Sequence, residues 1–351
     1  MTNLLVAREM VKKFYGKYEA FIMPVIKFVL ALVTLCMINS SVGFMERINN
    51  ILIVIMVALL CSFLPSGFII LFAALFILLH FYALGLEVAA IAACVFLIMF
   101  LLFFRFSPKD SLVVLLTPLL FVFKVPYAIP LAMGLIGAPA SVVSVGCGVV
   151  VYYLVNYVSV NAVALKAMEA EEMTVRIRLV IDSILNNKAM LVTVVAFVIT
   201  MIIVYVIRRL SVDYSWTIAM VAGAIVNIVV LMIGDLMLDT NESILWLIVG
   251  SVLSLLIVKV LQFFVFNVDY SRTERVQFED DEYYYYVKAV PKINLAAPAK
   301  TVKQINTRTK VPASGGRSVV SDRVTPERTV TVERTRRGSK IDDISDFDNL
   351  E

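Results

Sequence analysis

Residues 51–84 read ILIVIMVALLCSFLPSGFIILFAALFILLHFYAL, an apolar stretch interrupted by one turn sequence, LPSG at residues 64–67. A transmembrane helix needs about 20 apolar residues to cross about 30 Å of hydrocarbon. The stretch is too long for one straight crossing, and a proline followed closely by a glycine favours a turn. We therefore expect two short spans here, at about 50–64 and 67–85.

Apolar runs of the same kind extend in both directions from this stretch. Hydrophobic residues make up 61% of the chain and charged residues 17%. A soluble domain is nearer about 45–50% apolar and about 25% charged. The composition predicts an all-α polytopic membrane protein with about ten transmembrane helices, eight at the fewest. The other expected spans are a short piece before Gly137 and residues 21–42, 86–104, 112–123, 141–158, 190–207, 216–236 and 244–266.

Residues 112–158 are broken by four prolines, Pro118, Pro126, Pro130 and Pro139, and by four glycines. Backbone that is broken inside a bilayer needs hydrogen-bond partners within the protein or in a water-lined cavity. We therefore expect this region to pack inside the helical bundle. Broken helices build substrate sites in transporters, and ordinary kinks and tight hairpins are the alternative interpretation.

The chain divides into four parts. We expect an amphipathic cytoplasmic N-terminus at 1–20, a transmembrane domain at 21–268, a juxtamembrane hairpin-like segment at 269–293 and a disordered tail at 294–351. Within the transmembrane domain, residues 161–187 carry apolar side chains at helical spacing, with charges on much of the remaining surface. This pattern is typical of an amphipathic helix that does not span the membrane.

The distribution of Lys and Arg predicts the orientation in a cell membrane, because short basic loops stay on the cytoplasmic side. The first 20 residues carry four basic residues, and further pairs lie within 105–109 and at 208–209. With ten crossings these sites share one side, so both termini are expected in the cytoplasm and the amphipathic helix opposite them. A re-entrant segment among the broken pieces would lower the count.

Polar residues and prolines within the apolar runs are the candidates for a pathway. A charge at the bilayer centre costs about 2.5–3.5 kcal/mol on insertion scales, so such a residue is expected to have a use. Packing between helices and snorkelling at helix ends are the alternative roles. His80 and Glu87 are two helical turns apart if the helix continues through Gly85. The candidates are His80, Glu87, Lys124, Pro126, Pro130, Pro139, Asn156, Asn227 and Asp235.

The sequence contains few residues or motifs that could form a catalytic site. It contains one histidine, which excludes two-histidine metal sites and the HExxH motif. It has neither a GxSxG elbow nor a P-loop. The four cysteines lie inside apolar runs and form no CxxC pair, so they predict neither a disulfide framework nor a zinc site. We therefore expect no enzyme activity, no metal, no cofactor and no nucleic-acid partner.

The segment after the last span has strand-like composition at 272–278 and 283–290, separated by the acidic sequence EDDE. This arrangement predicts a β-hairpin. It carries four consecutive tyrosines, Tyr283, Tyr284, Tyr285 and Tyr286. Tyrosine suits a cap at the membrane interface, and it equally suits a strand that docks a separate protein, such as an ATPase or an envelope component.

Residues 294–351 are polar and charged, and such a segment does not fold alone. Its basic part favours contact with anionic lipid, at about 1 kcal/mol per Lys or Arg near the surface. Ser339 follows two arginines, a context that suits a basophilic kinase, and its phosphorylation would weaken the lipid contact. A solvated tail without a specific partner is the alternative.

The segment 268–293, VDYSRTERVQFEDDEYYYYVKAVPKI, resembles the corresponding part of uncharacterised multi-pass membrane proteins from Gram-positive anaerobic bacteria. The resemblance covers under a tenth of the chain. It implies a bacterial inner-membrane setting and supplies no activity and no functional residues.

Two functions remain open at this point. The first is a permease-like or channel-like bundle that moves a small solute or ion along the broken segments around Pro65 and at 126–139. The second is a non-transporting scaffold that recruits envelope or cytoplasmic partners through its tail and amphipathic helix. Active transport would need a gradient or a separate ATPase, since the chain has no nucleotide-binding motif.

Overall fold

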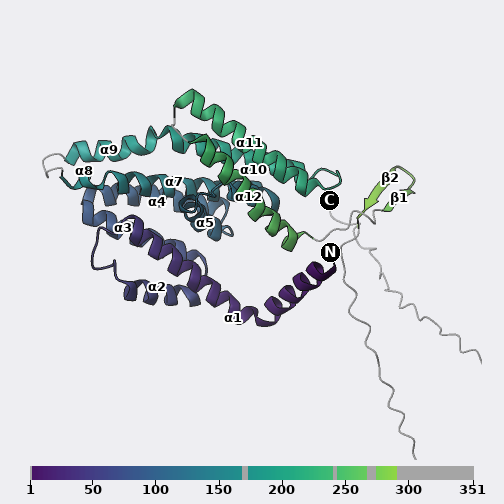
Figure 1. Cartoon of the computed structure of the whole chain (residues 1–351), viewed down its shortest axis with the longest axis horizontal. Coiled ribbons are helices and arrows are strands. Elements are labelled where there is room, and N and C mark those ends of the chain that lie inside the picture. Colours follow the sequence, from purple (N-terminus) through teal and green to yellow (C-terminus); the bar gives the residue numbers. More distant parts are fainter. Residues whose placement is uncertain (1, 168–172, 240–242, 267–273, 291–351) are drawn as a thin grey trace, which may run out of the picture. The chain divides into compact units, whose positions relative to one another are not determined.

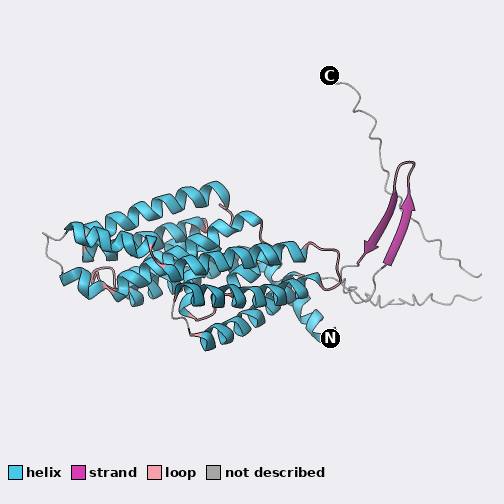
Figure 2. Ribbon diagram, turned by 90° about the horizontal axis from the view of Figure 1, so that it is seen from above, coloured by secondary structure: helices cyan, strands magenta, loops and turns pink. Residues whose placement is uncertain are grey.

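The computed structural model describes residues 2–167, 173–239, 243–266 and 274–290. Figure 1 shows that the described chain is almost entirely helical, and Figure 2 shows that many of its helices lie side by side, with one pair of strands. In chain order the elements are α1 (Thr2–Ser41), α2 (Ile51–Phe63), α3 (Gly67–Leu84), α4 (Leu86–Phe106), α5 (Ser111–Val122), α6 (Ala128–Ile136), the 3-10 turn η1 (Pro139–Ser141), α7 (Val142–Val160), α8 (Ala162–Ala167), α9 (Met173–Leu185), α10 (Lys188–Arg208), α11 (Ser215–Leu238), α12 (Ile244–Val265), β1 (Glu274–Glu279) and β2 (Tyr284–Ala289).

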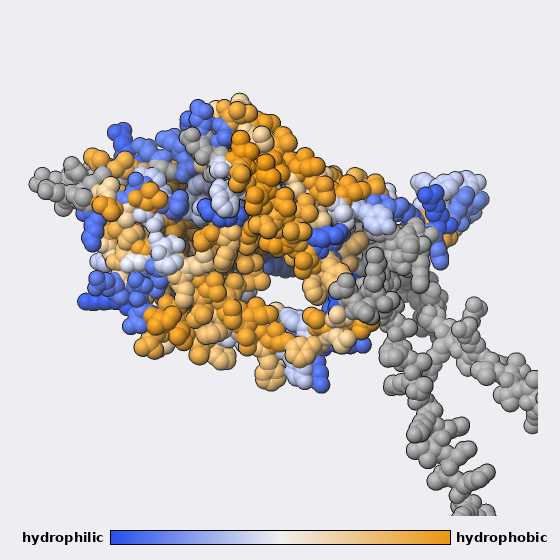
Figure 3. Space-filling view, in the orientation of Figure 1, coloured by the Kyte–Doolittle hydropathy of each residue, from blue (hydrophilic) through white to orange (hydrophobic). Residues whose placement is uncertain are grey.

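Seven helices of the described chain are long and apolar enough to cross a membrane, namely α1, α3, α4, α7, α10, α11 and α12. Their flanks expose large apolar side chains, such as Leu236 at 80%, and Figure 3 shows these flanks as hydrophobic surface. The prediction of a helical multi-pass protein agrees with this architecture. The prediction of about ten spans is not confirmed.

Two apolar helices are too short to count as ordinary spans. Helix α2 has 13 residues and α5 has 12. At a rise of about 1.5 Å per residue they reach about 18–20 Å, short of the about 30 Å of hydrocarbon. The sequence predicted both with nearly these bounds, at about 50–64 and 112–123.

The turn sequence at 64–67 separates α2 from α3 as expected, and side chains of α1 hold the break in place. Lys27 Nζ donates to the carbonyl of Leu64 at 3.0 Å, and Ser62 Oγ donates to the carbonyl of Pro24 at 2.8 Å. A cation at the C-terminal end of a helix satisfies a carbonyl that has no partner within the helix. Lys27 therefore has a structural role at the end of α2.

Helix α5 runs in the same direction as α7. Thr117 of α5 lies against Gly148 of α7, where a Cβ on the glycine would be 2.5 Å from Thr117 Cβ. One turn further along both helices, Phe121 stacks on Tyr152 with their ring centroids 4.2 Å apart. The absence of a side chain at Gly148 allows the two helices to approach this closely.

Helix α6 runs in the opposite direction, alongside α10. Gly134 of α6 lies against Val204, and one turn later Arg208 donates hydrogen bonds to the carbonyls of Leu135 and Gly137. Helix α10 is antiparallel to α7, because Tyr153 in the second half of α7 hydrogen bonds to Thr193 in the first third of α10. Helix α5 is parallel to α7, helix α6 is parallel to α10, and α7 and α10 are antiparallel. The pair α5–α6 therefore reverses direction at residues 123–127.

The amphipathic pattern at 161–187 forms α8 and α9, and residues 168–172 between them lie outside the described chain. Helix α9 packs on the bundle through Val180, which is fully buried, and Tyr157 of α7 donates to the carbonyl of Leu179. An amphipathic helix of this kind either lies on the membrane surface or packs against the bundle, and the structure favours packing against the bundle.

The expected β-hairpin is present as the antiparallel pair β1–β2, which places Phe278 opposite Tyr285. Asp280 closes its turn by accepting the backbone N–H groups of Glu282 and Tyr283 at 3.0 and 2.7 Å. Tyr285 Oη donates to the other carboxylate oxygen of Asp280 at 2.8 Å. Every residue of the hairpin from 274 to 289 except Lys288 is exposed.

Titration of Asp280 tests this turn. The hydrogen bond from Tyr285, followed by those from the backbone of Glu282 and Tyr283, lowers the pKa of Asp280 below its ordinary value. A lowered carboxyl pKa means that the bonds stabilise the hairpin above the unfolded pKa and are lost as the pH falls through the folded pKa. We expect Tyr285→Phe to raise the Asp280 pKa toward its ordinary value, measured by NMR on carboxyl-labelled protein. An unchanged pKa would contradict the bond.

Candidate functional site

The tip of the α5–α6 hairpin has an unusual backbone. Lys124 has a φ of 62°, in the left-handed region. A side-chain-bearing residue there costs roughly 1–2 kcal/mol, so such a conformation is kept where the surroundings impose it. At the start of the tip, three backbone N–H groups donate to carbonyls of α5: Phe123 to Leu119, Lys124 to Phe121 and Val125 to Leu120. These bonds satisfy the last carbonyls of α5.

Helix α12 fixes the tip from the other side. Ser254 Oγ donates to the carbonyl of Val125 at 3.3 Å. One turn earlier, Gly250 faces the carbonyl of Lys124, which would lie 2.8 Å from a Cβ at that position. Residues four apart share one face of a helix, so Gly250 and Ser254 together form the surface on which the tip rests.

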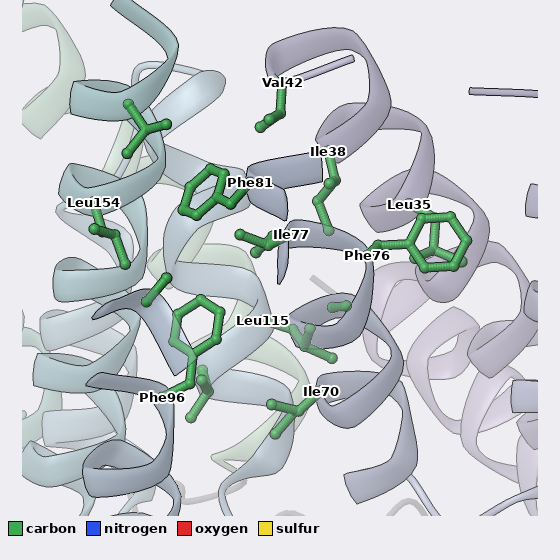
Figure 4. Close-up of a cluster of buried hydrophobic side chains, with 14 of the residues drawn as sticks. Leu35, Ile38, Val42, Ile70, Phe76, Ile77, Phe81, Phe96, Leu115 and Leu154 are labelled. Carbon is green, nitrogen blue, oxygen red and sulfur yellow. The ribbon is translucent and has the colours of Figure 1, made fainter. Parts of the chain in front are cut away.

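A cavity of about 550 Å³ lies between α1, α3, α4, α5 and α7. At one end its walls are buried and apolar, and include Ile70, Phe103 and Leu115. Figure 4 shows Ile70 and Ile77 of α3 gathered with Phe96 of α4 and Leu115 of α5 in this region. The other end is polar and more exposed, and is lined by Ser40, Ser41, Lys124, Asn156 and Ser159.

A second cavity of about 320 Å³ lies on the other side of the hairpin tip, among α7, α10, α11 and α12. Its walls carry hydroxyl groups, including those of Tyr127, Tyr153 and Thr193. Tyr153 and Thr193 hydrogen bond to each other at 2.9 Å. Trp246 and Leu247 at the start of α12, together with Val192 of α10 and Leu231 of α11, contribute apolar side chains to this wall.

Four residues line both cavities: Phe121, Lys124, Tyr152 and Asn156. The stacked rings of Phe121 and Tyr152 form part of the wall between the cavities. Among the described residues that line the two cavities, only Lys124 belongs to the residue types Lys, Arg, His, Asp and Glu. Within the described chain it forms no ion pair. A single positive side chain thus stands where the two cavities meet.

The structure brings together three of the residues that the sequence singled out, Lys124, Pro126 and Asn156. All three line the smaller cavity, and Lys124 and Asn156 line the larger one as well. Pro130 is buried within α6, and Pro139 begins η1. Their places account for the broken backbone of the region, because proline favours helix starts and turns.

His80 lies in a separate polar cluster. It is fully buried, Nδ1 accepts the backbone N–H of Met45 at 3.1 Å, and Nε2 is 2.9 Å from Asn39 Oδ1. Since Nδ1 accepts, Nε2 carries the proton and donates to Asn39. Asn39 in turn donates to the carbonyl of Ile48 at 3.0 Å. These bonds fasten the connection between α1 and α2, and His80 lines neither cavity.

The other candidates are dispersed. Glu87 is in the first turn of α4, and Gly85 separates that helix from α3, which carries His80. Asn227 is fully buried and accepts a hydrogen bond from Thr200 at 3.3 Å, joining α10 to α11. Asp235 is half-buried in α11. Tyr283, Tyr284, Tyr285 and Tyr286 are exposed, and Ser339 lies outside the described residues.

Sequence reasoning missed the aromatic residues of the site. Tyr127, Tyr152 and Tyr153 line the smaller cavity, and Phe121 and Tyr152 separate it from the larger one. The pair Tyr152-Tyr153 was a usable signal, because two adjacent tyrosines are unusual in the middle of an apolar span. Tyrosine is usually enriched at the membrane interface.

Within the described residues no group of three or more His, Cys, Asp or Glu side chains is placed to hold a metal ion. Comparison of the chain with protein-family models, curated proteins and solved structures found no match.

Proposed function

We propose that the protein is a permease-like membrane protein whose pathway passes the tip of the α5–α6 hairpin. The observation that carries the proposal is the meeting of two cavities at Lys124, on a helix pair that folds back within the bundle. Non-helical backbone at membrane depth is tolerated where it is buried in protein or lines a water-filled cavity. An ionisable residue at such a place indicates a pathway for a solute or ion.

The proposed topology has eight crossings. Helices α1, α2, α3, α4, α7, α10, α11 and α12 cross, and α5–α6 enters and leaves on one side. Ser66 at the start of α3 hydrogen bonds to Ser111 at the start of α5, while Ser41 at the end of α1 accepts from Ser159 near the end of α7. These pairs support one membrane face at the starts of α3 and α5 and the opposite face at the ends of α1 and α7. Helix α2 then connects the two faces despite its short length.

The proposed orientation places both termini in the cytoplasm of a bacterial cell. The end of the bundle at which α5 begins carries Lys109 and the pair at 208–209. The opposite end has a loop at 43–50 with one acidic and one basic residue. The excess of basic loops at the first end supports a cytoplasmic position for that end. Both cavities then open toward the outer face.

Transport and accessibility measurements test the proposal together. We expect Asn156→Cys, in a chain without other cysteines, to react with a membrane-impermeant thiol reagent added outside the cell, and Lys109→Cys to react only after permeabilisation. Proteoliposomes containing the protein should release at least one of a set of radiolabelled small anions, cations and neutral solutes faster than empty liposomes. Release that is equal for both, across the set, would contradict the permease proposal.

The scaffold remains the second candidate, because the β1–β2 hairpin exposes aromatic side chains on both of its faces. A separate ATPase or envelope protein is the proposed partner, and anionic lipid is the proposed contact of the basic tail. Deleting residues 294–351 separates the two functions. A permease retains flux after the deletion, whereas a scaffold loses the partner that co-purifies with the intact chain.

A further inference from the structure

We propose that the larger cavity binds a single-chain amphiphile with an anionic head group, such as a long-chain fatty acid. Its chain would lie between α1, α3, α4 and α5, and its head would lie beside Lys124. This inference rests on the proposed permease function and names the class of its solute.

The apolar end of the cavity excludes a small inorganic ion as its occupant. Ile70, Phe103 and Leu115 are between 3 and 7% exposed and line this end. An ion placed among such side chains would lose its hydration without gaining a hydrogen-bond donor or an opposite charge. Enclosed apolar cavities instead stay dry and take apolar ligands.

The dimensions of the cavity fit one extended alkyl chain. Cys147 lines it near one end and Ser159 near the other, and at about 1.5 Å per residue these two positions on α7 are about 18 Å apart. That length is more than half of the about 30 Å of hydrocarbon. A volume of about 550 Å³ over this length leaves a mean cross-section of about 30 Å².

The polar end supplies what a head group needs. Asn156 offers an amide group and Lys124 offers the positive charge, whereas the hydroxyls of Ser40 and Ser159 already donate to the carbonyls of Met37 and Ser41. An anionic oxygen that accepts from an ammonium group forms a stronger hydrogen bond than a neutral oxygen. Since no acidic residue lines the cavity among the described residues, the charge of Lys124 is left for a ligand.

The order of these features along the cavity matches an amphiphile entering from the outer leaflet. The buried apolar walls are deep in the bundle, and the polar walls are at the end where Ser159 hydrogen bonds to Ser41. A neutral alcohol would fill the apolar part without using the charge. A short carboxylate would use the charge without filling the apolar part. Only a long-chain anion uses both.

Binding measurements on the full-length protein in phosphatidylcholine nanodiscs test this inference. Radiolabelled palmitate is expected to bind saturably, and hexadecanol and butyrate are expected to bind much more weakly. Lys124→Gln should weaken palmitate binding by about tenfold or more, whereas Lys124→Arg should retain it, because a charge-assisted hydrogen bond contributes that much. Lys109→Gln is the matched control, since Lys109 lines neither cavity.

A second pair of variants tests the chain-binding part. Ala74 lines the larger cavity, and Ala90 is exposed on α4. Ala74→Phe should abolish saturable palmitate binding, and Ala90→Phe should leave it unchanged. A diazirine-bearing palmitate should crosslink to peptides from α4 and α5. Crosslinks spread over all the exposed helix flanks, or palmitate binding that neither Lys124→Gln nor Ala74→Phe weakens, would overturn the inference.

The same preparations separate this inference from the proposed function. Palmitate binding with the expected variant pattern, but without flux of any solute in proteoliposomes, supports the binding site and contradicts the permease. Flux of a small solute without saturable palmitate binding overturns the binding site and retains the permease. Butyrate or phosphate binding as tight as that of palmitate, and equally sensitive to Lys124→Gln, overturns the inference in favour of a small-anion site.

Discussion

Replacing Gly148 with leucine is expected to separate α5 from α7 and to leave little folded protein. A Cβ at this position would lie 2.5 Å from Thr117 Cβ and 2.8 Å from its hydroxyl oxygen. Thr117 is fully buried, and its hydroxyl donates to the carbonyl of Val113 at 2.7 Å, so it has no room to withdraw. We expect a destabilisation of roughly 4 kcal/mol or more, which is large for one substitution.

Alanine at Gly148 gives a graded version of this test, with a matched control on the same helix. Overpacking costs roughly 1–3 kcal/mol, while glycine to alanine within a helix gains about 1 kcal/mol. A Cβ at Gly146 would meet nothing within 4 Å. We therefore expect Gly148→Ala to lower the unfolding temperature in detergent and Gly146→Ala to raise it. Equal increases for both variants would show that α5 and α7 do not approach as described.

Replacing Arg208 with methionine is expected to free the end of the α5–α6 hairpin. The guanidinium donates to the carbonyls of Leu135 and Gly137, and its carbon lies 4.8 Å from the ring centroid of Tyr205. Charge-assisted hydrogen bonds contribute about 1.5–3 kcal/mol each. Because the side chain is only half-buried, solvent screening lowers the sum, and we expect a loss of about 3 kcal/mol in the free energy of unfolding.

Two further substitutions make the Arg208 experiment specific. Arg208→Lys keeps the charge but not the pair of guanidinium N–H donors, so an intermediate loss in the free energy of unfolding is expected. Arg209 lies beside the same ring, with its carbon 4.7 Å from the Tyr205 centroid, but it is exposed. Arg209→Met should therefore change the unfolding temperature little. A loss as large as that of Arg208→Met would indicate a general effect of charge in this loop.

Composition, together with residues that end helices or form turns, predicted much of the fold. The turn sequence at 64–67 separates α2 from α3, the acidic sequence after Phe278 turns the hairpin, and Pro139 starts the turn that precedes α7. Each of these features depends on residues that are close in sequence, because proline, glycine and short acidic runs act on the backbone around them. Such turns and helix starts can therefore be predicted from the sequence without knowledge of the tertiary structure.

The folding back of α5 and α6 could not be read in the same way. Its direction depends on Gly148, Arg208 and Gly250, which lie far from the hairpin in the sequence. The periodicity of residues 112–136 is compatible with two consecutive crossings or with one hairpin. The choice between them is made by the helices against which they pack.

The candidate site was predicted in part for a similar reason. Lys124 was recognisable as a charge next to prolines in an apolar region, and Asn156 as a polar residue in a span. His80 was equally recognisable, yet Asn39 and Met45 satisfy both of its ring nitrogens. Whether a polar side chain in an apolar run faces a cavity or a buried partner is a property of the packing.

The bonds from Arg208 have a consequence for the synthesis of the chain at the ribosome. Arg208 lies 73 residues after Leu135, whose carbonyl it satisfies. At about 5–20 residues per second, the nascent hairpin waits about 4–15 s for this partner. Until then the carbonyls of Leu135 and Gly137 lack this partner. The hairpin therefore makes its final contacts only after α10 has been synthesised, and a chain truncated before Arg208 lacks these bonds.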